Sequence, residues 1–173
     1  TGVYNTAVGS QAGASIAGDG NYNTLIGTIA GDAITTGDDN TAVGRGALTT
    51  CTTSSQNTAI GSVALEALTT GANNTAIGYA AGTTLTTGGA NVFVGYDAGK
   101  DQTTAGASTF VGDHSGANVT TGANNTFVGY YSGLTATTAH SSVFVGKDAG
   151  KLFTTGNASV AVGMSALATG TTA

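Results

Sequence analysis

A glycine preceded by valine or isoleucine returns along the whole chain at a nearly fixed interval. The spacing is 18 residues once and 17 at every later step, at Gly9, Gly27, Gly44, Gly61, Gly78, Gly95, Gly112, Gly129, Gly146 and Gly163. Such a period is the signature of one small structural unit stacked many times, and it takes precedence over local patterns. The 173 residues are therefore predicted to form a single repeat domain, 1–173, of ten units.

Each unit carries two apolar columns. The residue before the glycine is always Val or Ile, which favours a strand over a helix. Seven residues after the glycine a second column holds Ile16, Ile34, Cys51, Leu68, Leu85, Val119 and Phe153, interrupted by Gln102 and Ala136. Seventeen residues cannot bury a core alone, so two short strands per unit must stack on those of the next. The sequence predicts an all-β fold, a parallel β-solenoid or β-roll of ten coils of about 17 residues.

The polar composition fits this arrangement. Asparagine, or serine in three units, stands at the start of the first strand: Asn5, Asn23, Asn40, Asn57, Asn74, Asn91, Ser108, Asn125, Ser142 and Ser159. Stacking would align these side chains in a hydrogen-bonded ladder. The chain contains no proline, as expected where interior coils need their N–H groups for both neighbours.

The first strand is apolar on both faces. If the Val/Ile column points inward, the preceding residue points outward, and that position holds only Ala, Leu or Phe. We expect this column to be an assembly face, formed chiefly by Leu25, Phe93, Phe110, Phe127 and Phe144. Thr-Thr follows the second apolar column from Thr35–Thr36 to Thr171–Thr172, so one Thr per coil should face solvent.

Several kinds of chemistry are not expected. Asp113-His114-Ser115 has the residue types of a catalytic triad, but adjacent residues cannot converge on one reacting atom. His114 and His140 lack partners for a metal site, Asp38-Asp39 is interpreted as a solvated corner, and Cys51 as a small buried hydrophobe. We therefore predict no enzyme, catalytic residue, metal or cofactor. Four Lys and Arg residues and a net charge of −5 argue against nucleic acid, and no apolar run approaches the roughly 18 residues of a membrane span.

Tyrosines gather after the repeated glycine. Tyr79, Tyr96 and Tyr130 follow it directly and Tyr131 comes next, so stacking should place them along one edge. Such an edge either faces a ligand, such as a carbohydrate, or covers the coil corner or a groove between chains. The pairs Asp97/Lys100 and Asp148/Lys151 are expected as exposed corner pairs.

The segments NTAVG, NTAIG and NTFVG, followed by xxAG, resemble a known family. They are similar to the S/N-x-A-I/V-G repeats in the head of YadA-like trimeric autotransporter adhesins, and similar repeats occur in bacteriophage tail fibres. The resemblance covers essentially the whole chain. It implies a left-handed, trimeric β-roll whose inner strands face a three-fold axis.

These features favour a non-enzymatic structural or adhesive segment of an extracellular fibre, at a bacterial surface or on a virion, that mediates attachment. Its expected partners are copies of itself, most simply in a trimer, and a host-surface glycan or protein. The chain begins and ends in mid-repeat, which fits an excerpt of a longer fibre or a stacking subunit. The alternatives are a self-assembling extracellular filament subunit and an ice-binding β-solenoid, although ice-binding faces usually present two outward Thr columns separated by one residue.

Overall fold

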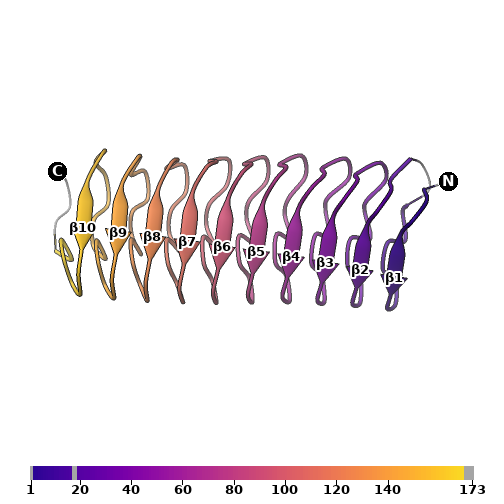
Figure 1. Ribbon diagram of the computed structural model, residues 1–173, viewed down its shortest axis with the longest axis horizontal. Coiled ribbons are helices and arrows are strands. Elements are labelled where there is room, and N and C mark those ends of the chain that lie inside the picture. The colour runs from indigo at the N-terminus through magenta and orange to yellow at the C-terminus, as the bar shows by residue number, and fades with distance from the viewer. Residues whose placement is uncertain (1, 17–18, 170–173) are drawn as a thin grey trace.

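The chain forms a single row of ten short strands. The computed structural model describes residues 2–16 and 19–169, and the strands lie side by side in chain order along a straight axis (Figure 1). Their bounds are β1 (Thr6–Val8), β2 (Thr24–Ile26), β3 (Thr41–Val43), β4 (Thr58–Ile60), β5 (Thr75–Ile77), β6 (Val92–Val94), β7 (Thr109–Val111), β8 (Thr126–Val128), β9 (Val143–Val145) and β10 (Val160–Val162).

Every strand pairs with the next in parallel and in register. Ile60 lies opposite Ile77, for example, and Phe110 opposite Phe127. Because parallel neighbours are joined by a full coil of chain, the row of strands is one side of a parallel β-solenoid. The prediction of an all-β, parallel β-solenoid is therefore confirmed.

The predicted second strand is absent from the described residues. In the coil that follows β5, Ala80 and Gly82 have φ of 52° and 60°, so the chain is still turning as it approaches the second apolar column. That side of the coil is joined to its neighbours by separate hydrogen bonds, such as Thr86 N–H to the Thr103 carbonyl at 2.8 Å. The column itself points inward as predicted, since Leu68, Leu85 and Val119 are fully buried.

The repeated glycine follows from the close approach of successive coils. At Gly78 φ is +140°, and a Cβ there would lie 2.2 Å from the Gly95 carbonyl oxygen of the next coil. Any side chain would therefore push two coils apart at the end of the strand. Glycine satisfies both the backbone conformation and the spacing.

The asparagine ladder forms as predicted. The Oδ1 atom of Asn74 accepts hydrogen bonds from the backbone N–H and the side-chain amide of Asn91, each at 3.0 Å. The Asn91 amide also donates to the Ala105 carbonyl at 3.1 Å. Since these groups are buried, the ladder satisfies polar atoms that would otherwise destabilise the stack.

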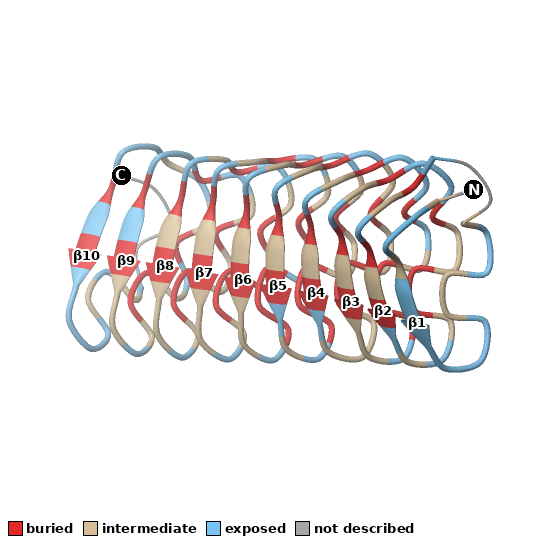
Figure 2. Ribbon diagram, turned by 45° about the vertical axis from the view of Figure 1, so that its right-hand side comes forward, coloured by how far each residue is buried: buried red, intermediate tan, exposed pale blue. Residues whose placement is uncertain are grey.

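The central residue of each strand faces the core. Leu25, Phe93, Phe110, Phe127 and Phe144 are all 0% exposed within a single chain, and Figure 2 shows buried centres flanked by more exposed ends along β2 to β10. The prediction that these five side chains form an assembly face is wrong. The inward assignment of the Val/Ile column is wrong for the same reason, because neighbouring residues of a strand point to opposite faces.

The core accommodates large and small side chains in complementary pairs six residues apart. Strand centres with Phe are followed by glycine, as in Phe127 and Gly133, where an added Cβ would lie 2.4 Å from the ring. Strand centres with Ala are followed by leucine in three coils, as in Ala59 and Leu65, and both of these residues are fully buried. The two positions therefore share one volume. The four Phe rings stack along the axis with centroids 5.4, 4.9 and 4.8 Å apart.

Candidate functional site

The first and third residues of the strands form the outer strand face. The third position is Val or Ile in every strand, and the first is Thr in β1–β5, β7 and β8 and Val in β6, β9 and β10. Ile60 and Ile77 are 38% and 39% exposed, whereas their inward neighbours are fully buried. No strand residue is charged. The outer strand face is thus a continuous apolar and hydroxyl surface along the row.

Exposed large hydrophobic side chains of the described residues concentrate around this face. Those outside the strands lie mostly at the corner before them, as Val3, Tyr4 and Tyr22, or at the corner after them, as Tyr79, Tyr96, Tyr130 and Met164. Leu152 and Leu167 are the exceptions in the described part of the chain. The rod therefore has one predominantly apolar side.

The predicted tyrosine edge is present. Tyr79 and Tyr96 stack with ring centroids 5.2 Å apart and an angle of 14° between the rings. His114 continues the row, with its ring centroid 5.3 Å from that of Tyr96 and 5.2 Å from that of Tyr131. Tyr130 lies against Tyr131 at 4.0 Å. We call Tyr79, Tyr96, His114, Tyr130 and Tyr131 the aromatic edge.

The spacing within the aromatic edge limits what it can bind. A sugar ring held between two aromatic faces needs a van der Waals separation of about 3.5–4.0 Å on each side, and the rings are only 5.2 Å apart at Tyr79 and Tyr96. The gap between Tyr79 and Tyr96 is therefore too narrow to admit a sugar ring. Elsewhere on this edge, a hydrogen bond with the side chain of Tyr131 raises the pKa of Tyr130 to about 12, and desolvation adds to the effect.

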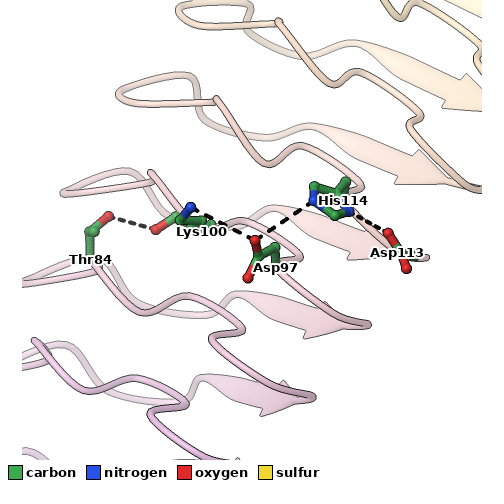
Figure 3. Close-up of polar contacts among 5 residues, drawn as sticks. All are labelled: Thr84, Asp97, Lys100, Asp113 and His114. Atoms are coloured by element: carbon green, nitrogen blue, oxygen red, sulfur yellow. Dashed lines mark hydrogen bonds and ion pairs between the residues drawn. The ribbon is translucent and has the colours of Figure 1, made fainter.

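His114 of the aromatic edge also belongs to a cluster of charged and polar side chains (Figure 3). The Asp97 carboxylate approaches Lys100 Nζ and His114 Nε2, each at 3.7 Å, and Asp113 contacts the other ring nitrogen of His114. The Thr84 hydroxyl donates to the Lys100 carbonyl at 2.7 Å. The contacts of Asp97 with His114 and of Thr84 with Lys100 join successive coils, whereas the other two lie within one coil. Asp97 is buried, not exposed as predicted, and its Oδ1 has no hydrogen-bond partner.

A related pair lies three coils further on. Lys151 Nζ is 3.0 Å from the Asp148 carboxylate and 4.7 Å from the centroid of Tyr131. The two residues pair as the sequence predicted, but both are half-buried and not exposed. Lys147 approaches the same carboxylate at 4.0 Å. Lys151 therefore pairs with Asp148 and also contacts Tyr131 of the aromatic edge.

The structure separates the other residues that the sequence singled out. The Ser115 hydroxyl is buried and donates to the Phe127 carbonyl at 3.0 Å, away from the exposed Asp113. His140 Nδ1 accepts from the Ala123 N–H at 3.1 Å. Burial raises the pKa of the Cys51 thiol, and Cys51 is fully buried, as expected. Asp39 is exposed, whereas Asp38 is half-buried and accepts from the Asn21 N–H at 2.6 Å.

The Thr pairs lie on the side of the coil opposite the strands. The second Thr of each pair is exposed in eight consecutive coils, at Thr36, Thr53, Thr70, Thr87, Thr104, Thr121, Thr138 and Thr155. The first Thr also reaches the surface, and its hydroxyl donates to the next coil, as from Thr86 to the Thr103 carbonyl at 3.0 Å. From Thr69 to Thr154 the first Thr is half-buried, so the second Thr is the outward residue of these pairs, as predicted, whereas Thr35 and Thr52 are exposed as well. Thr171–Thr172 lies outside the described residues.

Within residues 2–16 and 19–169, no group of three His, Cys, Asp or Glu side chains is arranged to hold a metal ion, and no enclosed pocket is present. The same residues include no helix with the length and hydropathy needed to cross a bilayer. Comparison with protein-family models, with curated proteins and with solved structures finds no match to this chain.

Proposed function

We propose that this chain is a non-enzymatic segment of an extracellular fibre that mediates surface attachment, on a bacterial cell or on a virion, and that its copies associate side by side through the outer strand face. One observation carries the proposal: an uncharged Val/Ile and Thr surface runs along every strand on one side of the rod. Apolar surface of this extent on a soluble rod marks an interaction site.

The size of the outer strand face favours more than one partner per chain. Ten strands at a spacing of about 4.8 Å, each three residues wide, give an area of roughly 430 Å². A stable pairwise interface buries about 800 Å² on each partner. If several copies form a closed ring, each chain contacts two neighbours. The corners that flank the strands then add to the area buried on each chain. Burial of the face alone contributes about 10 kcal/mol before the cost of association.

The resemblance to YadA-like head repeats supports a three-fold arrangement. In that architecture the strands face a common axis, and here the outward residues of the strands are the Val/Ile column. A left-handed trimer would bury this column and leave the Thr pairs on the outside. The aromatic edge would then border the contact and remain available to a host-surface glycan or protein.

Matched variants within one coil test the association. Ile77→Asp places a charge on the outer strand face, whereas Thr87→Asp places the same charge on the opposite side of the same coil. By light scattering we expect the parent chain and Thr87→Asp to have the mass of a trimer and Ile77→Asp that of a folded monomer. A monomeric parent chain, or a trimeric Ile77→Asp variant, would contradict the proposal. A mass that grows continuously with concentration would instead indicate a filament.

The attachment role is tested on a glycan array. Because Tyr96 is 48% exposed and Tyr96→Phe removes only its hydroxyl, this variant should weaken glycan binding without disturbing the stack. Binding that is absent, or unchanged by this variant, would leave the rod as a spacer and remove the aromatic edge from the attachment role.

The Thr pairs favour ice binding as a second candidate function. The second Thr of each pair is exposed in eight successive coils, so this side presents a regular column of exposed hydroxyl-bearing side chains, with the first Thr of each pair beside it. A thermal-hysteresis measurement with Thr70→Lys and Thr87→Lys, compared with Ile77→Lys, tests the idea. Hysteresis that is absent from the parent chain, or insensitive to the Thr substitutions, would eliminate it.

A further inference from the structure

All six tyrosines of the chain occur as contacting pairs. Tyr4 and Tyr22 stack with centroids 5.1 Å apart and rings within 10° of parallel, and Tyr79 and Tyr96 stack at 5.2 Å and 14°. Tyr130 and Tyr131 are neighbours in sequence. The first two pairs each connect successive coils.

The stacking follows from the in-register coils. Tyr79 and Tyr96 each follow the glycine that ends a strand, and β5 and β6 pair directly. Tyr4 and Tyr22 each precede the asparagine at the start of a strand, with φ of 60° and 58°. The fold therefore holds each pair of phenols together and exposes both members, since Tyr4, Tyr22, Tyr79 and Tyr96 are 74%, 57%, 49% and 48% exposed.

We propose that Tyr4–Tyr22 and Tyr79–Tyr96 are sites of oxidative cross-linking, at which a dityrosine bond joins adjacent coils of one chain. The co-reactant is a one-electron oxidant, such as a haem peroxidase acting with hydrogen peroxide. It removes one electron and one proton from each phenol. The two phenoxyl radicals then combine through ring carbons ortho to the oxygens, and each carbon passes its hydrogen to its own oxygen. The chain loses two hydrogen atoms per bond, and one hydrogen peroxide becomes two waters.

Few other oxidisable side chains compete at the surface. The chain has no Trp, its one Cys is buried, and its one Met, Met164, lies in the last coil, far along the rod from both pairs. Radicals formed on an exposed tyrosine therefore meet the stacked partner first. At micromolar protein, an effective concentration of at least millimolar favours coupling within the chain over coupling between chains by about a thousandfold.

The proposal goes beyond the fibre function and does not depend on it. A bond between Tyr79 and Tyr96 would close a loop of one coil and oppose the separation of β5 from β6. Oxidised chains are denatured before they are analysed, so a link within one chain is distinguished by size from a link between associated copies.

Oxidation of the full chain with a haem peroxidase and hydrogen peroxide, at micromolar protein, tests the proposal. We expect dityrosine fluorescence, a loss of two hydrogens per bond by mass spectrometry, and no increase in chain size on a denaturing gel. Thermolysin peptides should contain Tyr79 joined to Tyr96 and Tyr4 joined to Tyr22. Tyr96→Phe should abolish the first link and retain the second, whereas Tyr130→Phe should retain both.

The same oxidation in concentrated urea serves as the comparison. An unfolded chain should join its six tyrosines in many combinations, because no pair is then held together. Native pairings that dominate only in the folded chain support the proposal. No intrachain link in the folded chain, mainly interchain links, or the same mixture of pairings with and without urea would overturn it.

Discussion

Exchanging the sizes of Phe127 and Gly133 tests how the core is packed. The ring of Phe127 is fully buried, with the rings of Phe110 and Phe144 at 4.9 and 4.8 Å. A Cβ on Gly133 would lie 2.4 Å from Phe127. In the coil of β4 the same two positions hold Ala59 and Leu65. The double variant Phe127→Ala/Gly133→Leu therefore gives the coil of β8 the same two residue types that occur in the coil of β4.

Each single change should be costly, and the two together should not. Phe127→Ala leaves a cavity and should lower the free energy of unfolding by about 3–5 kcal/mol. Gly133→Leu should cost about 1–3 kcal/mol from overpacking. It should cost about 1 kcal/mol more because residue 133 has φ of 60°. In the double variant the leucine fills the cavity, so only the backbone cost and imperfect packing remain, about 1–2 kcal/mol.

Urea unfolding of the full chain measures these differences from the midpoint and slope. Val128→Ala serves as the control, because Val128 lies one residue further along β8 on the outer strand face and its truncation should cost about 1 kcal/mol or less. If the double variant were destabilised by the sum of the single changes, residues 127 and 133 would not share one volume. If Val128→Ala cost more than Phe127→Ala, the assignment of the strand faces would be wrong.

Three further predictions concern polar groups. Asn74→Ala removes the acceptor of two Asn91 hydrogen bonds and should lower the free energy of unfolding by about 2–4 kcal/mol in thermal or urea unfolding. The control Asn73→Ala, at an exposed residue, should lower it by under about 1 kcal/mol, and equal effects of the two variants would contradict the ladder. In a spectrophotometric titration one of the six tyrosines should ionise near pH 12, because hydrogen bonding raises the pKa of Tyr130 to about 12, and Tyr131→Phe should return it toward about 10. Burial raises the pKa of Cys51, so the unfolded thiol ionises first; the parent chain should lose stability relative to Cys51→Ala as pH rises above about 8.5, and a constant difference would refute this.

The period and the asparagine column were sufficient to predict the stack of coils. The strand faces could not be assigned from hydrophobicity, because Val/Ile and Ala/Phe are both apolar columns. The signal that decides between them is the inverse size relation six residues apart in eight of the ten units, in which Phe127 accompanies Gly133 and Ala59 accompanies Leu65; only Ala7/Gly13 and Ala76/Gly82 are small at both positions. Two residues that change size in opposite directions must fill one space, and that space is inside the coil.

The aromatic edge was predicted from register, whereas the cluster around His114 was not. Asp97, His114 and Tyr131 occupy the same place in successive units, two residues after the repeated glycine. Reading this column along the chain would have placed Asp97 against His114. The sequence carries no comparable signal that the second strand would not form. Ala80 has a positive φ in the structure, but an alanine in the sequence does not indicate this backbone conformation.

The direction of the hydrogen bonds between coils determines how the rod responds to force. Strands cross the long axis, so the bonds between them run along it (Figure 1). Tension applied at the two ends pulls on the bonds of one coil at a time, because each coil is held only by its neighbours. Each coil that separates releases 17 residues, or roughly 55–60 Å of extended chain. We therefore expect a stepwise extension that limits the peak load, while compression keeps the coils in contact.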